Sequence, residues 1–169
     1  VVSAKWKAFT PGTTVNVTGT SNPEIKVCGR LNGYNSTSDY TRFSITGEAT
    51  ISGNINSLWD YKNVSTDLKP YCGYGLFNGC TALVDASQLT LPSTTLAVHC
   101  YESMFQGCTN LNYIKCLAKT GINYDYSTTN WVEDVSSTGI FVKDPSMNSW
   151  PIGSTNGIPI GWTIIDAVP

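Results

Sequence analysis

Residues 71–83 read YCGYGLFNGCTAL, and residues 100–111 read CYESMFQGCTNL. Six residues recur at an offset of 28 positions, as the pairs Cys72 and Cys100, Phe77 and Phe105, Gly79 and Gly107, Cys80 and Cys108, Thr81 and Thr109, and Leu83 and Leu111. A fixed period in the twenties is typical of proteins built from stacked repeats. One unit cannot bury its apolar side alone, whereas a copy stacked on it can. We therefore predict an internal repeat whose equivalent side chains lie directly above one another.

The repeat period predicts where the strands of the other units begin. Counting back one period from Leu83 reaches Ile55, so the first unit is expected to contribute a strand without its convex turn. Pro92 restricts the backbone before it, so the strand of the second unit should end near residue 91. Five short strands of one parallel sheet are predicted, at residues 55–58, 83–86, 111–114, 140–142 and 162–165.

Convex turns are expected opposite these strands, at residues 71–80, 99–108 and 130–136. In the third of them, Asn130 and Glu133 have the spacing of a capping box. This pattern predicts a helix of one or two turns over residues 130–135. The fold class is therefore mainly β with short helices.

Residues 1–52 show a different pattern, in which apolar and polar residues alternate between turn residues. Such period-two alternation indicates half-buried strands. Four strands are predicted, at residues 13–18, 24–28, 40–45 and 48–52. We interpret residues 1–52 as a small antiparallel β unit that covers the first repeat, and residues 53–169 as the repeat region with a C-terminal cap. An end cover of this kind protects exposed sheet edges from self-association.

The central pattern CY..MF.GCT.L, with its LP.TTLA-type spacer, resembles the BspA-like leucine-rich repeats of surface proteins from Bacteroides-type bacteria. Flanking residues 53–58, 138–143 and 157–163 add to the resemblance, which covers about residues 41–166. It implies a short leucine-rich-repeat solenoid and a bacterial cell-surface or secreted protein that acts in binding or adhesion. The family shares a scaffold while its partners vary, so the resemblance does not name the ligand.

The composition favours an extracellular β-rich protein. Charged residues make up only 13% of the chain, and the net charge of −2 is spread without a block of either sign. The absence of a Lys/Arg cluster argues against nucleic acid and anionic membranes as partners. No apolar run of about 18 residues is present, so no bilayer span is expected. The chain begins at Val1 rather than Met, as a processed secreted protein would.

Four of the six cysteines lie at repeat-equivalent positions, where they are expected to stack as small buried thiols. Oxidation of Cys72 with Cys100, or of Cys80 with Cys108, stays open as an alternative, because stacked units bring equivalent thiols near each other. The spacing of the two cysteines within each unit is too wide for a zinc knuckle. No metal site and no cofactor are predicted.

Catalytic residues are not apparent in this sequence. His99, the only histidine, adjoins Cys100, but Cys100 belongs to the repeated core position and neighbours in sequence usually point apart. Glu133 and Asp134 are adjacent rather than facing each other across a cleft, as glycoside hydrolysis would require. No phosphate-binding loop or nucleophile motif occurs. The chain is therefore not expected to be an enzyme.

The repeat register points to a binding face on the open side of the sheet, which solenoids commonly use. If the repeated leucines point inward, the intervening strand positions face outward. These candidate binding residues form two rows, Ser57, Asp85 and Tyr113, and Trp59, Ser87 and Lys115. A solvated surface is the competing interpretation.

The expected partner is a protein on a host or neighbouring cell, or a glycan. Two other functions stay open, a carbohydrate-binding module and a structural surface or phage-tail-like element. The sequence does not determine the partner, the mode of surface anchoring or the oligomeric state.

Overall fold

The structure is a computed structural model that describes residues 14, 25–29, 36–38, 40–62, 64, 67–122 and 125–168. Within these ranges the chain consists mainly of strands, as predicted, with one short helical element. In chain order the elements are β1 (Ala49–Asn54), the 3-10 helix η1 (Ile55–Leu58), β2 (Leu83–Thr90), β3 (Tyr113–Cys116), β4 (Ile140–Lys143), β5 (Ile152–Gly153), β6 (Ile158–Pro159) and β7 (Thr163–Asp166). No helix in the described part of the chain is long and apolar enough to cross a membrane.

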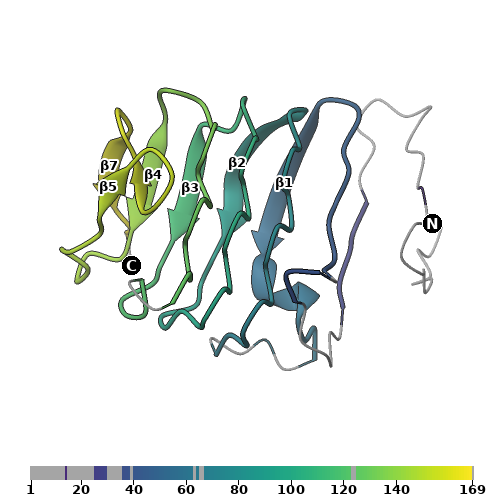
Figure 1. The fold of residues 1–169 in the computed structure, drawn as a ribbon, viewed down its shortest axis with the longest axis horizontal. Coiled ribbons are helices and arrows are strands. Elements are labelled where there is room, and N and C mark those ends of the chain that lie inside the picture. The colour runs from purple at the N-terminus through teal and green to yellow at the C-terminus, as the bar shows by residue number, and fades with distance from the viewer. Residues whose placement is uncertain are drawn as a thin grey trace.

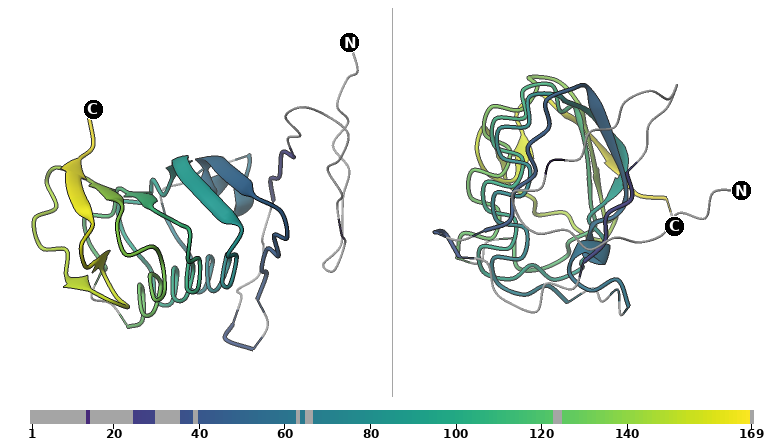
Figure 2. Two further views of the ribbon diagram at one scale, coloured as in Figure 1. Left: turned by 90° about the horizontal axis from the view of Figure 1, so that it is seen from above. Right: turned by 90° about the vertical axis from the view of Figure 1, so that its right-hand side faces the viewer.

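The strands form three small parallel sheets, in the orders β1-β2, β3-β4-β7 and β5-β6. Figure 1 shows β1, β2, β3 and β4 side by side, each displaced along the long axis of the molecule from the one before. Parallel neighbours need a crossover connection, and here the chain returns along the opposite side of the molecule (Figure 2). Among the described residues, no sheet closes into a barrel.

The last three strands pair in parallel within one sheet, as predicted, although β3 begins two residues later than the strand expected at residues 111–114. Ile114 in β3 lies opposite Phe141 in β4, which lies opposite Ile164 in β7. The prediction of a single five-stranded sheet is wrong, however, because β2 and β3 are joined only by an isolated bridge between Leu91 and Cys116. Leu83 and Leu111 are one full repeat period apart, whereas the bridged pair is three positions closer in the chain. The second unit therefore has three more residues between its repeated leucine and the bridge than the third unit has. Because of these extra residues, β2 does not stay in register with β3.

The convex side is built from turns that are linked by a regular set of backbone hydrogen bonds. Between residues 73 and 79, every second N–H group donates to a carbonyl of the next unit; these bonds are Gly73 to Cys100 (2.7 Å), Gly75 to Glu102 (2.9 Å), Phe77 to Met104 (2.9 Å) and Gly79 to Gln106 (2.7 Å). The N–H groups between them donate within the unit, as from Leu76 to Gly73 at 3.2 Å. The same alternation links residues 101–107 to residues 127–133 at 2.8–3.0 Å.

A positive φ recurs at every fourth residue of these turns. It occurs at Tyr71, Gly75 and Gly79, then at His99, Ser103 and Gly107, and then at Tyr126, Asn130 and Asp134. This pattern overturns the helix predicted at residues 130–135. A right-handed helix cannot include left-handed residues at two of its positions, and residues 125–134 instead form a third run of turns. The third convex segment therefore begins five residues earlier than predicted.

The first unit differs most from the prediction. Residues 40–45 form no strand, but the Phe43 ring stacks on Phe77 at a centroid distance of 5.4 Å. The Phe43 N–H also donates to the Leu76 carbonyl at 2.8 Å. The interval from Phe43 to Phe77 exceeds the repeat period by six positions, so the first unit is longer than the others. Subtracting one repeat period from Phe77 therefore does not reach Phe43, where the first unit starts.

The additional length of the first unit lies after its strand. β1, expected in an antiparallel unit, instead pairs in parallel with β2. Residues 55–58, expected as a strand, form η1, because the Asn54 side chain accepts a hydrogen bond from the Asn56 N–H at 2.9 Å and starts a helical turn. Of the other predicted N-terminal strands, residues 25–28 form none, and the strand at 13–18 lies outside the described residues except for Thr14.

The core is a row of aromatic rings that runs along the stacked turns. Phe77 lies over Phe105 with ring centroids 5.6 Å apart and planes 4° from parallel, as the repeat predicts. Phe43 extends the row on one side and Trp131 on the other, at 5.4 Å and 6.4 Å. The Trp131 side chain is fully buried. Equivalent side chains of successive units therefore pack on one another.

All six cysteines are free thiols, which agrees with the stacked interpretation rather than with oxidation. The Cys80 thiol donates to the Phe43 carbonyl at 3.2 Å, and the Cys108 thiol donates to the Phe77 carbonyl at 3.1 Å. Each of these two cysteines therefore binds the backbone of the preceding unit. Burial also raises the pKa of Cys108 to about 12 from the ordinary value of 9.0.

We expect the free energy of unfolding to fall as the pH rises above 9. Burial raises the pKa of Cys72, Cys108 and Cys116 to about 12 in the folded chain. A raised folded-state pKa stabilises the protein fully below the unfolded value of 9.0, and this stability is lost as the pH passes through the folded value. Urea unfolding at neutral and alkaline pH measures the change.

A pair of cysteine variants separates the contribution of the buried thiols to the alkaline loss of stability from that of other groups that titrate at high pH. Cys108→Ala should reduce the alkaline loss of stability, and Cys28→Ala is the control for removal of a cysteine that is only half-buried. An equal alkaline loss in both variants would contradict the assignment to buried thiols.

Candidate binding face

An open hollow of about 300 Å³ lies on the strand side of the molecule, between residues of β2, β3 and β4. It is lined by Asp85, Ser87, Asn112, Tyr113, Thr138, Gly139 and Ile140. These residues come from three successive units, so stacking of the units creates the hollow. Hydroxyl and amide groups surround a single carboxylate and a single aromatic ring.

Asp85 provides the charge in the hollow, and Ser87 fixes its orientation. The Ser87 backbone N–H donates to Asp85 Oδ1 at 2.7 Å, and the Ser87 hydroxyl donates to Oδ2 at 3.2 Å. Both residues are half-buried and lie in β2, where Asp85 pairs with Thr50 of β1. A carboxylate that is already held by two hydrogen bonds loses little conformational freedom when it binds a ligand.

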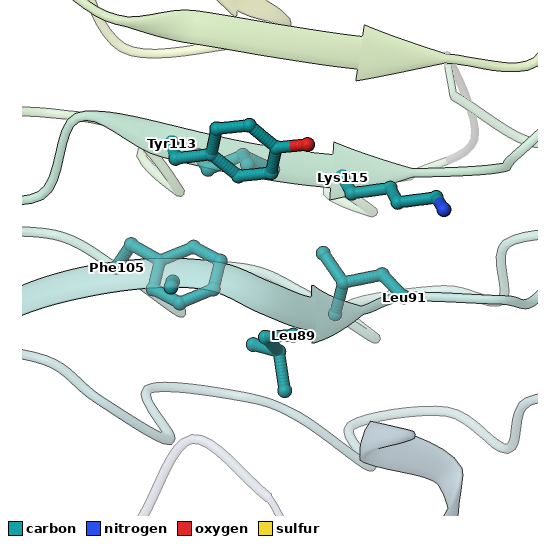
Figure 3. Close-up of a pocket in the computed structure, with 7 residues that line it drawn as sticks. Leu89, Leu91, Phe105, Tyr113 and Lys115 are labelled. Atoms are coloured by element: carbon teal, nitrogen blue, oxygen red, sulfur yellow. The ribbon is translucent and has the colours of Figure 1, made fainter. Parts of the chain in front are cut away.

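Tyr113 provides the aromatic ring at the start of β3. It lies opposite Ile140 of β4, whose side chain is 39% exposed. Figure 3 shows the Tyr113 ring and the Lys115 side chain on β3, next to Leu89 and Leu91. We call Leu89, Leu91, Phe105, Tyr113 and Lys115 the apolar seam; these residues lie between β2 and β3, which are joined only by the isolated bridge between Leu91 and Cys116, and Leu89, Leu91 and Phe105 are buried. The ring therefore borders both the hollow and the apolar seam.

Gly139 allows β3 and β4 to approach closely at the edge of the hollow. A Cβ atom at Gly139 would lie 2.5 Å from the Asn112 carbonyl oxygen and 2.7 Å from the Trp162 ring. The same Asn112 oxygen accepts the Ile140 N–H at 2.9 Å, and the Gly139 carbonyl accepts the Thr163 N–H at 2.8 Å. The position of Thr138 and Ile140 beside Tyr113 therefore depends on this glycine.

The structure brings together three of the six predicted binding residues. Asp85, Ser87 and Tyr113 all line the hollow. Lys115 lies in the apolar seam, where its carbonyl accepts the Leu91 N–H at 2.9 Å, so it is in register with Leu91 rather than with Ser87. The shift follows from the three extra residues of the second unit.

Ser57 and Trp59, the two other predicted binding residues, lie outside the hollow. Ser57 is part of η1 and Trp59 follows it, so neither occupies the predicted strand position. The Ser57 carbonyl accepts the Gly29 N–H at 3.0 Å. Trp59 is half-buried against the core.

Sequence reasoning missed the residues that the third and fourth units contribute, namely Asn112, Thr138, Gly139 and Ile140. A signal for them was present, because Tyr113 and Ile140 are separated by nearly one repeat period and both begin a strand. The two predicted rows of outward-facing binding residues included only the first three units. Extending them by one unit would have reached the fourth strand.

The side chains weighed for catalysis do not converge on a nucleophile. The Cys100 side chain is fully buried, and burial raises its pKa well above the ordinary value. The His99 ring instead lies between the rings of Tyr71 and Tyr126, at 4.4 Å and 4.9 Å, and its Nδ1 contacts Glu102 Oε2. Within the described part of the chain, no three His, Cys, Asp or Glu residues are placed to hold a metal ion.

Comparison with protein-family models, curated proteins and solved structures finds no significant match to this chain.

Gly139→Ala is expected to lower the free energy of unfolding by about 1–3 kcal/mol, because the new methyl group overlaps the Asn112 carbonyl and the Trp162 ring. Gly47→Ala is the matched control, since nothing lies within 4 Å of its added Cβ. Chemical unfolding of both variants measures the difference. Equal stabilities would show that β3 and β4 do not require this close approach.

Proposed function

We propose that this chain is a non-catalytic binding protein of the BspA-like leucine-rich-repeat type, and that it binds a protein partner through the face around the hollow. Its units would form a short solenoid on a secreted or surface-exposed protein of a bacterium, with a role in adhesion. The stacking of Phe77 on Phe105 and the hydrogen bonds between equivalent turns support a repeat architecture.

The observation that carries the proposal is the pairing of an oriented carboxylate with an aromatic ring on adjoining strands. Asp85 is held by Ser87, and Tyr113 lies in the next unit, with both facing one hollow. Aromatic residues at the centre of a contact, surrounded by polar groups, typically supply most of the binding free energy. Placement on strands rather than on free loops reduces the entropy lost on binding.

The residues around the hollow favour binding over hydrolysis. Asp85 is the only carboxylate among the lining residues, whereas glycoside hydrolysis generally uses two carboxyl groups about 5–10 Å apart. Its two oxygens already accept hydrogen bonds from Ser87, which suits a fixed acceptor.

A protein partner suits the mixture of groups on this face. Tyr113, the exposed Ile140 and the neighbouring Lys115 combine aromatic, apolar and charged contacts, as the centres and rims of protein interfaces do. A glycan is the second candidate, because Ser87, Asn112 and Thr138 supply the hydroxyl and amide groups that bind sugars and Tyr113 supplies a ring.

Tyr113→Ala should weaken binding by about tenfold or more, since loss of a central aromatic contact typically costs more than about 1 kcal/mol. Arrays of extracellular protein domains and of glycans identify the binder, and surface plasmon resonance on that binder measures the change. Tyr61→Ala is the control, because Tyr61 is 48% exposed and does not line the hollow.

Two further variants separate the hollow from the region around η1. Asp85→Asn keeps the shape of the side chain and removes its charge, so it tests whether the partner is cationic at this point. Trp59→Ala tests the η1 region independently. Unchanged binding in Tyr113→Ala and Asp85→Asn would refute the proposed face.

A further inference from the structure

The outer edge of β7 is an unpaired sheet edge with main-chain groups directed away from the molecule. β7 pairs with β4 on one side, and no described strand pairs with its other side. The Thr163 and Ala167 N–H groups donate to the β4 side, each at 2.8 Å. Because alternate residues of a strand direct their N–H and C=O groups to the same side, those of Ile164 and Asp166 face outward. This edge therefore presents two donors and two acceptors.

The turn side of the same end of the molecule is closed, in contrast to the strand side. The Val132 N–H donates to the Thr155 carbonyl at 3.3 Å, and the Asn130 N–H donates to Asn156 Oδ1 at 2.8 Å. The Trp131 indole N–H donates to the Gly157 carbonyl at 2.7 Å. The loop before β6 thus satisfies donors of the last run of turns, while β7 has no equivalent cover among the described residues.

β7 carries only part of the protection that is usual for a sheet edge. Natural edge strands are kept from pairing by short length, charged side chains, Pro or a bulge; β7 has four residues and one charge, Asp166, but no Lys, Pro or bulge. The sequence of β7 is TIID, and its register with β4 is unbroken. Ile164 and Ile165 are 38% and 43% exposed, and Val168 beyond them is 88% exposed. Figure 1 shows β7 at the C-terminal end of the row of strands.

We propose that β7 pairs with β7 of a second copy of this chain, antiparallel about a two-fold axis that passes by Ile165. In this register Ile164 of each copy lies opposite Asp166 of the other, so the outward N–H and C=O groups of both residues are matched. Ile165 then faces its own equivalent at a non-hydrogen-bonded position, where side chains are closest. The β3-β4-β7 sheet would continue across the axis into the second copy.

The charges on the edge permit this self-association. Asp166 is the only charged residue of β7, and its Oδ1 accepts a hydrogen bond from Lys143 Nζ at 2.5 Å. Each copy therefore carries a neutralised pair at the contact rather than an unpaired carboxylate. Pairing would also cover Ile164, which lies in register with the buried Phe141 and is exposed because no further described unit packs on it. A symmetric contact of this kind closes at two copies.

Sedimentation velocity of the full chain over a wide concentration range tests the proposal. The expected species has twice the monomer mass of 18.3 kDa. Ile164→Pro removes an outward N–H and no bond to β4, and should raise the dissociation constant by at least about tenfold. Ile164→Ala retains that N–H and is the matched variant, which should still dimerise. Ile165→Lys should give a folded monomer, whereas Ile25→Lys, at an exposed isoleucine outside β7, should leave the dimer intact.

A cysteine substitution tests the register. Ile165→Cys should form a disulfide-linked dimer under mild oxidation, because facing residues at a non-hydrogen-bonded position lie within disulfide range. Val168→Cys should cross-link far less, and circular dichroism checks that every variant is folded. A monomer at all concentrations, or a dimer that persists in both Ile164→Pro and Ile165→Lys, would overturn the inference. Because β7 does not line the hollow, this outcome is independent of the proposed function.

Discussion

Backbone hydrogen bonds along the turns alternate between the neighbouring unit and the same unit, and this alternation forces the units to stack. Every second N–H group between Gly73 and Gly79 donates to the next unit, and the groups between them donate within their own unit. Buried backbone donors must be paired, so no single unit is satisfied without its neighbour. A positive φ recurs at every fourth residue of the same turns. Stacking is thus a requirement of the backbone as well as a result of apolar burial.

Because the turns are stacked, side chains at equivalent positions of neighbouring units pack against one another. Phe77 lies between Phe43 and Phe105, and the small thiol of Cys108 reaches the Phe77 carbonyl. A larger side chain at the cysteine position would separate the units that the turns hold together. Close packing of this kind leaves little room for substitution, which explains why the repeat identities are concentrated in the turns.

The strand side is less constrained, and the candidate binding face and the open edge both lie there. Three extra residues in the second unit end the pairing of β2 with β3, which produces the apolar seam beside Tyr113. The hollow next to it collects side chains from three units. At β7 the main-chain groups of Ile164 have no neighbouring strand among the described residues. Regular turns thus fix the scaffold, while irregular strands provide its surfaces.

The repeat and the stacking of Phe77 on Phe105 were predictable because the same residues recur at a constant offset in the sequence, and the strands at β4 and β7 were predictable from their apolar runs. Three features became evident only from contacts in three dimensions: the first unit starts near Phe43, Asn130 and Asp134 belong to turns, and Asn112 lines the hollow. A period read from two good copies cannot reveal insertions in the others. Local patterns such as the capping box are overridden when a neighbouring unit supplies the hydrogen bonds.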